Sequence, residues 1–189
     1  MAEADTRFRH ETERLILRDW QDEDWTRFWD GTNTPAVMRW LGGVCDGDKR
    51  QAAQDRLLSY EREHGHTFWC VERKEDGAIL GFCGLKRCNQ KGGPIGMMEV
   101  GWRLREDAWG KGYAKEAAIA SLDLAFDRFG ADEVIALTVE GNTPSWGLMI
   151  RLGMERREDL DFPNDDFDPE SGTIIVYSID RGDWALLNG

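Results

Sequence analysis

The chain has 189 residues, of which 41% are hydrophobic and 32% charged, and its formal net charge is −12. This composition is typical of one globular domain spanning residues 1–189, and so negative a surface argues against nucleic acid as a partner. No apolar run approaches the length of a membrane span, and the first ten residues lack the apolar core of a secretion signal, so we expect a cytoplasmic protein.

The first half of the chain predicts helices and strands after a loose polar tail at residues 1–12. In chain order we expect a strand at 14–20, helices at 21–31 and 46–65, and two strands at 66–73 and 78–88 joined by a hairpin turn.

The second half alternates strands and helices. We expect strands at 97–104, 134–139 and 173–179, with helices at about 112–129 and 142–153, the latter capped by Thr143. The hairpins together with one strand–helix–strand crossover indicate an α+β fold.

The stretch "AWGKGYAKEA", from Ala108 to Ala117, joins a predicted strand to a predicted helix. The first amides of a helix lack internal partners, and glycines let a ligand approach the backbone, so this turn could cradle a phosphate. Lys111, Lys115, Arg103 and Arg105 supply nearby positive charge. An ordinary turn that needs glycine for its geometry is the alternative, and the usual nucleotide-binding glycine motifs are absent.

Four cysteines, at positions 45, 70, 83 and 88, form no Cys-x-x-Cys pair, and with the three histidines they give no zinc spacing. We therefore expect reduced, partly buried thiols, no metal, and no covalent cysteine intermediate.

Two segments resemble a known family. "EVGWRLREDAWGKGYAKEA" and "LAFDRFGADEVIALTVEGNTPSWGLMIRLGM" are similar to the GCN5-related N-acetyltransferases, especially the RimJ/RimL-type branch, as are "TERLILRDW" and "AILGFCGL". The resemblance covers roughly residues 11–180. It implies the GNAT fold, in which acyl-CoA lies where a mixed central sheet is splayed between its fourth and fifth strands.

The resemblance also implies binding residues for acetyl-CoA. The amides of residues 110–115 would hold its phosphates, amides near Arg103 and Leu104 would pair with pantetheine, and Asn142 and Ser145 would contact the pantetheine and the thioester sulfur. Trp109 departs from the Gln or Arg of the general motif. The expected binding residues are Arg103, Leu104, Arg105, Trp109, Gly110, Lys111, Gly112, Tyr113, Ala114, Lys115, Asn142 and Ser145.

Three residues are candidates for the chemistry. Glu99 matches a family glutamate that acts as a base through water, Asp161 in the acidic stretch 157–172 is a second candidate base, and Ser145 would help to protonate the thiolate. Each has a plain structural alternative: a paired strand carboxylate, a solvated acidic loop, and a helix cap.

The sequence therefore predicts an N-acetyltransferase that moves the acetyl group of acetyl-CoA directly to a primary amine in a ternary complex. A non-catalytic acyl-CoA-binding module with the same fold is the alternative. The negative charge favours a cationic acceptor, such as a protein N-terminus or a polyamine, and the resemblance leaves a homodimer open.

Overall fold

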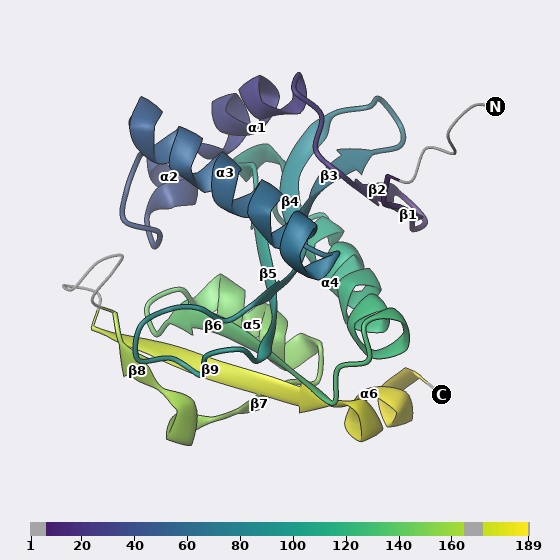
Figure 1. Cartoon of the computed structure of the whole chain (residues 1–189), viewed down its shortest axis with the longest axis vertical. Coiled ribbons are helices and arrows are strands. Elements are labelled where there is room, and N and C mark those ends of the chain that lie inside the picture. The colour runs from purple at the N-terminus through teal and green to yellow at the C-terminus, as the bar shows by residue number, and fades with distance from the viewer. Residues whose placement is uncertain (1–6, 165–171, 189) are drawn as a thin grey trace.

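A nine-stranded mixed sheet organises the computed structural model, which describes residues 7–164 and 172–188 (Figure 1). The strands follow the order β1-β2-β3-β4-β5-β6-β9-β7, and β8 also pairs with β9. Their bounds are β1 Arg9–Glu11, β2 Leu15–Arg18, β3 Phe68–Arg73, β4 Ile79–Arg87, β5 Met98–Leu104, β6 Glu133–Val139, β7 Glu155–Arg156, β8 Phe162–Pro163 and β9 Thr173–Asp180. The predicted α+β class is confirmed.

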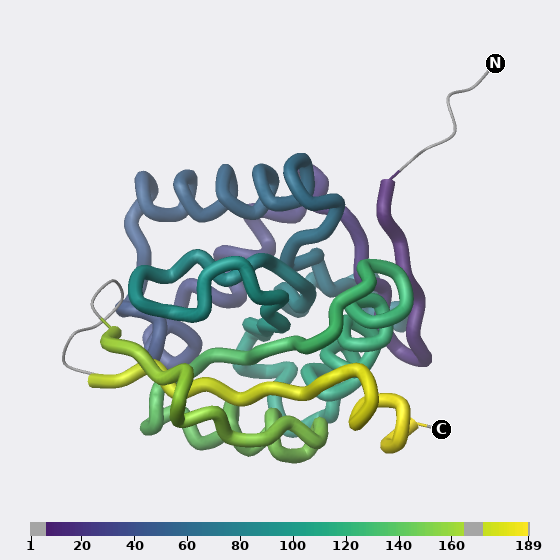
Figure 2. The backbone as a smooth tube through the Cα atoms, turned by 60° about the horizontal axis from the view of Figure 1, so that its bottom comes forward, coloured from purple at the N-terminus to yellow at the C-terminus, as the bar shows by residue number. Residues whose placement is uncertain are grey.

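Helices cover both faces of the sheet. Their bounds are α1 Asp24–Thr32, α2 Pro35–Met38, α3 Gly47–His64, α4 Tyr113–Asp123, α5 Thr143–Arg151 and α6 Arg181–Asn188, with 3-10 turns at Glu106–Ala108 and Glu158–Leu160. Helix α4 packs on β2, β4 and β5 from one side, whereas α1 packs on β4 and β5 from the other, and α3 runs alongside α1 (Figures 1 and 2). Among the described helices, none is long and apolar enough to cross a membrane.

Strand β5 alternates between these two faces. Met98, Val100 and Leu104 are buried in the main core with the alanines of α4. Glu99 and Arg103 are paired with Lys86 and Phe82 of β4. Their side chains alternate with those of the core residues, and they therefore lie on the face covered by α1 and α3. Because successive side chains of β5 point to opposite faces, its apolar residues enter the core and two charged residues lie on the other face.

The sheet opens in the middle. Strands β5 and β6 run parallel but pair only at Met98–Val134 and Glu99–Ile135, after which they separate. By contrast, β4 and β5 pair along seven residues, and so do β6 and β9 on the other side of the gap. The predicted splay between the strands at 97–104 and 134–139 is confirmed.

The expected loose tail is wrong from residue 9 onward. Arg9–Glu11 forms β1 against β2, because Phe8 stacks on Trp69 with ring centroids 4.1 Å apart and its amide donates to the Asp19 carboxylate at 2.6 Å. One aromatic residue thus orders a polar segment.

Helix ends agree with the predictions to within a few residues. Asp46 caps α3 by accepting from the Lys49 amide at 2.9 Å, and Gly65 ends it in the left-handed conformation. Asn142, rather than Thr143, occupies the N-cap position of α5. The helix expected to reach residue 129 leaves α-geometry earlier, as a π-helical turn at Leu124–Arg128.

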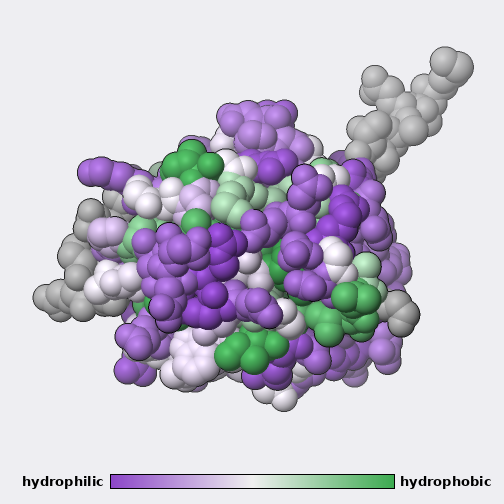
Figure 3. Space-filling view, turned by 90° about the horizontal axis from the view of Figure 1, so that it is seen from below, coloured by the Kyte–Doolittle hydropathy of each residue, from purple (hydrophilic) through white to green (hydrophobic). Residues whose placement is uncertain are grey.

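The surface on the lower side of Figure 1, seen in Figure 3, is mostly hydrophilic with small separate apolar patches. Ile150, Leu186 and Leu187 are among the exposed large apolar residues. Scattered exposure of this kind is ordinary.

A carboxyl pair makes the stability of the protein dependent on pH. The pKa of Glu61 is raised to about 7, first because the side chain is partly buried and then because it faces Asp19. A carboxyl whose pKa rises on folding stabilises the fold below its unfolded value, and this contribution is lost as pH rises through the folded value. We therefore expect the melting temperature to fall as pH rises from the ordinary carboxyl pKa of 4.5 to the folded value of about 7, and to fall less in Glu61→Gln. The exposed Glu13→Gln is the control, and an equal slope in Glu61→Gln and the wild type would contradict the assignment.

Candidate active site

The turn between β5 and α4 presents a row of free amides. Gly110 and Gly112 have φ angles of 70° and 80°, which L-residues rarely adopt, and α4 begins directly afterwards at Tyr113. Within the described residues, no amide of residues 110–115 donates to a protein acceptor. Converging amides at a helix N-terminus form an anion site, and these fit the phosphates of a nucleotide-containing ligand.

A carboxylate beside this cradle is neutralised. Glu116 accepts from the Arg14 amide and its Nε, both at 2.7 Å, and from the Thr12 hydroxyl at 2.6 Å. Burial raises the pKa of Glu116, but the hydrogen bonds from Thr12 and Arg14 outweigh it and lower the pKa below its usual value. Arg14 also donates to the Lys111 carbonyl and lies 4.5 Å from the Tyr113 ring centroid, so it braces the turn.

Two predicted cations do not face the ligand site. Arg105 pairs with Asp107, and the Lys111 ammonium donates to the Asp107 carbonyl at 2.8 Å, so both side chains are held within the turn itself. Trp109 donates from its indole nitrogen to the Leu104 carbonyl at 2.9 Å and stays 48% exposed. The positive character of the cradle therefore comes chiefly from its amides and from Lys115.

The free edge of β5 faces the gap in the sheet. The Arg105 amide donates to the Leu80 carbonyl, so by strand alternation the backbone of Arg103 also points to β4, and the backbones of Trp102 and Leu104 point to the gap. The backbone groups free for the expected pairing with pantetheine are therefore those of Trp102 and Leu104, and not those of Arg103.

A cavity of about 1480 Å³ joins the cradle, the gap and the α1–α3 side of the sheet. Most of the predicted site residues line it: Glu99, Arg103, Leu104, Trp109, Gly110, Gly112, Tyr113, Ala114, Lys115, Asn142 and Ser145. The predicted residues that do not line it are Arg105, Lys111 and Asp161.

Glu99 is buried in this cavity wall beside Lys86, a residue that the sequence analysis did not single out. The Lys86 ammonium lies 3.3 Å from Glu99 Oε2 and also donates to the side-chain oxygens of Asn89 at 2.9 Å and Gln90 at 3.3 Å. Burial raises the pKa of Glu99 despite the opposing effect of Lys86. A carboxylate with a raised pKa next to a cavity is suited to accept a proton near neutral pH.

Asn142 and Ser145 lie where β6 runs into α5. Asn142 occupies the N-cap position but its side chain makes no capping hydrogen bond. In the described part of the chain, neither side chain has a hydrogen-bond partner, and both line the cavity. The side chain of Asn142 therefore does not cap α5, as the structural alternative expected it to do.

Asp161 is not among the residues that line the cavity, although its neighbour Phe162 is. Its carboxylate forms a two-point ion pair with Arg156, one bond being 2.6 Å long, and accepts from the Val176 amide at 3.1 Å. It therefore joins the segment after β7 to β9, a structural role. Residues 165–171 of the same acidic stretch lie outside the described residues.

The cysteines are free thiols, as predicted, and three of the four are buried. Burial raises the pKa of Cys70, of Cys83 to about 12, and of Cys88. Neutral buried thiols are poor nucleophiles. Among the described residues, no group of His, Cys, Asp and Glu is arranged to hold a metal ion.

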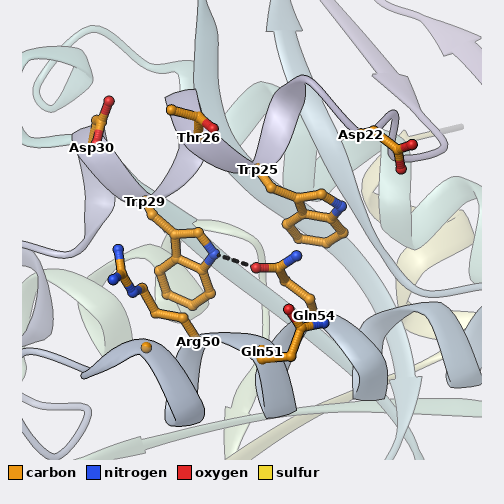
Figure 4. Close-up of a pocket in the computed structure, with 9 residues that line it drawn as sticks. Asp22, Trp25, Thr26, Trp29, Asp30, Arg50, Gln51 and Gln54 are labelled. Atoms are coloured by element: carbon orange, nitrogen blue, oxygen red, sulfur yellow. Dashed lines mark hydrogen bonds between the residues drawn. The ribbon is translucent and has the colours of Figure 1, made fainter.

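A smaller hollow of about 410 Å³ lies between α1 and α3 (Figure 4). Inside it the Trp29 indole donates to Gln54 Oε1 at 3.0 Å, joining the two helices. Trp29 also lines the large cavity, so this bond supports the wall opposite β5.

Comparison with known proteins agrees with the splayed sheet and its cradle. Residues 14–155 match the family model described as an acetyltransferase (GNAT) domain. The chain belongs to the GNAT family. It is therefore an acetyl-CoA-dependent acetyltransferase, as the resemblance implied.

Individual relatives extend this result. The uncharacterized protein YkkB of Bacillus subtilis (strain 168) is 34% identical over 144 residues, which are 76% of this chain and 83% of YkkB. An acetyltransferase structure from Agrobacterium tumefaciens str. C58 is 25% identical with a TM-score of 0.77, covering 96% of this chain and 99% of its own. The ribosomal-protein-S5-alanine acetyltransferase of Vibrio fischeri has a TM-score of 0.70 at 18% identity, covering 94% and 98% of the two chains, a likeness of fold.

The cradle gives a direct test. Replacing Gly112 with alanine forces a side chain onto a φ angle of 80° and changes the direction of the neighbouring amides. We expect the dissociation constant for acetyl-CoA, measured by calorimetry, to rise about tenfold or more. Gly77→Ala is the matched control, because Gly77 has a φ angle of 69° in a hairpin turn that does not line the cavity. Equal acetyl-CoA affinity in the two variants would exclude the cradle.

Proposed function

We propose that this acetyltransferase transfers the acetyl group of acetyl-CoA directly to a primary amine, with Glu99 as the base. The observation that carries the proposal is the position of Glu99, which is the last β5 residue paired with β6 before the sheet opens. Leu104, next to the cradle, lies five residues further on, or about 17 Å along a strand. That span suits an extended pantetheine arm between a phosphate site and a reacting thioester.

The residues around the gap supply the steps that acetyl transfer to an amine needs. Glu99, directly or through a water, takes a proton from the amine, whose nitrogen then attacks the thioester carbon. A carbon–nitrogen bond forms, the carbon–sulfur bond breaks, and the departing thiolate takes up the second proton, which the nitrogen loses as it becomes an amide. Ser145 lines the same cavity, and its hydroxyl can donate a hydrogen bond to the sulfur.

No protein thiol is needed in this scheme. Cys70, Cys83 and Cys88 are buried, and none of them lines the cavity. The amine and the thioester would therefore meet in a ternary complex, with the amine entering from the side of α1 and α3.

Release of free CoA from acetyl-CoA tests the function. The protein is incubated with acetyl-CoA and a panel of amines and N-terminal peptides, and the thiol is measured. An acceptor-dependent signal that disappears in Gly112→Trp supports the proposal. A rise in melting temperature with acetyl-CoA, but no thiol with any amine, would instead support a binding module that has lost the chemistry.

Glu99 gives the sharper prediction. Because the pKa of Glu99 is raised, the rate should fall on acidification as the carboxylate is protonated, at a pH above its ordinary value of 4.5. In Glu99→Gln we expect kcat to drop roughly 10²-fold or more, with this acidic limb lost and the affinity for acetyl-CoA kept.

Asp161→Asn is the matched control, since Asp161 forms an ion pair with Arg156 and is not among the residues that line the cavity. It should lower the melting temperature and keep the acidic limb of the rate profile. Loss of the limb in Asp161→Asn, with its retention in Glu99→Gln, would reverse the assignment of the base.

A further inference from the structure

The large cavity carries a charge opposite to that of the chain. The whole sequence has 36 acidic and 24 basic residues. Among the described residues that line the cavity, one is acidic, Glu99, whereas six are basic: Arg39, Arg56, Lys86, Arg103, Lys115 and Arg151. The net charge of the chain is therefore a poor guide to what enters this site, and the local lining favours an anionic ligand.

Arg103 differs from the other cations of this lining because one nitrogen of its guanidinium is buried without a hydrogen-bond partner in the described chain. Its Nε is buried without a hydrogen bond, and within the described chain the guanidinium forms no ion pair. Instead it lies over the rings of Phe82 and Phe28, 5.0 Å and 5.8 Å from their centroids. These rings orient the guanidinium but supply no acceptor for its N–H groups.

Arg18 shows how this protein pairs a buried arginine that has a structural role. The buried Arg18 donates to both oxygens of Asp24, at 2.7 and 2.9 Å, and to Glu72 at 2.7 Å. A buried cation is normally paired in this way, because desolvation without compensation is unfavourable. Arg103 is only half-buried, but its Nε is enclosed and, within the described residues, no carboxylate pairs with it, so we look for its partner in a ligand of the cavity.

A second arginine reinforces the site. Arg56, on α3, also lines the cavity and acts electrostatically on Arg103. Burial, together with the charge of Arg56, lowers the pKa of Arg103 to about 10, which still leaves the guanidinium charged at neutral pH. An anion between the two residues would relieve both the desolvation and the repulsion.

We propose that the acceptor amine carries a separate anionic group, such as a carboxylate or phosphate, which Arg103 binds with the help of Arg56. This inference rests on the proposed function, since it assumes that the amine end lies at Glu99. It replaces the cationic acceptor that the net charge suggested.

The spacing on β5 adds a length requirement. Glu99 and Arg103 project from the same face of the strand, four residues or about 13 Å apart at the backbone. Gly101 lies between them, and a Cβ there would be 2.7 Å from the Phe68 ring, so this ring covers the interval. The acceptor should therefore have its amine and its anionic group at opposite ends of an apolar chain, not on one carbon atom.

A matched set of acceptors tests this. We would measure kcat/KM for 6-aminohexanoate, 6-aminohexyl phosphate, hexylamine, 1,6-diaminohexane and glycine. An anionic long-chain amine should exceed hexylamine and the diamine at least tenfold, and should exceed glycine. The carboxylate and the phosphate arms show which anion is preferred. In Arg103→Gln the ratio of anionic to neutral acceptor should fall at least tenfold, with a smaller fall in Arg56→Gln and in Arg103→Lys.

Binding supplies an independent readout. Hexanoate, which has the anion but no amine, should inhibit competitively against the acceptor in the wild type and less in Arg103→Gln. Arg62→Gln is the control, because Arg62 is exposed on the same helix as Arg56 and does not line the cavity. It should leave both the preference and the inhibition unchanged.

The outcomes separate this inference from the proposed function. Acetylation of hexylamine or the diamine at least as well as the anionic amines, with a ratio that Arg103→Gln and Arg56→Gln leave unchanged, would overturn the inference and keep the function. Absence of acetylation with every amine would overturn the function. If Arg103→Gln does not fold, the acceptor preference of the wild type and the Arg56→Gln result still decide the matter.

Discussion

The parting of β5 and β6 after only two paired positions is the constraint on which the site depends. Because β5 and β6 stop pairing beyond Glu99 and Ile135, the backbone of β5 keeps unused donors and acceptors along its last residues. A ligand that supplies the missing strand is thereby held beside the carboxylate at the vertex and the amides at the open end. The cradle, the gap and Glu99 are therefore consequences of one break in the sheet.

Electrostatics in this protein are decided locally. In a chain of net charge −12, the turn before α4 presents backbone dipoles to an anion, while Arg14 neutralises the nearby Glu116. Arg105 and Lys111, two cations that the sequence analysis expected near the phosphates, instead bind Asp107: Arg105 pairs with its carboxylate, and Lys111 donates to its carbonyl. Interactions over a few ångströms outweigh the screened field of the distant surface.

The sequence predicted the features that depend on local pattern. Alternation and helical spacing located the main strands and helices, and the glycines with their flanking residues located the cradle, because these signals lie within a short stretch of chain. It missed β1, which depends on Phe8 meeting Trp69, and it gave no sign that Asp161 pairs with Arg156, which becomes a neighbour only in the folded turn.

The sequence could not predict that Arg56 and Arg103 line the same cavity, for the same reason. Arg56 and Arg103 are far apart in the chain, and nothing in either local stretch shows that they line one cavity, or that no described carboxylate pairs with Arg103. Lys86 beside Glu99 is an intermediate case, since the strand pairing that joins them links two strands that are consecutive in the sequence.

The placement of Glu99 and Arg103 on one strand has a consequence for selectivity. A paired β-strand is among the stiffest parts of a fold, and β5 is fixed along its whole length by β4. The distance between the two charged side chains therefore cannot adapt much to different guests. The fixed separation of Glu99 and Arg103 would therefore select acceptors by the length between their amine and their anionic group, more than by the shape of the chain between these groups.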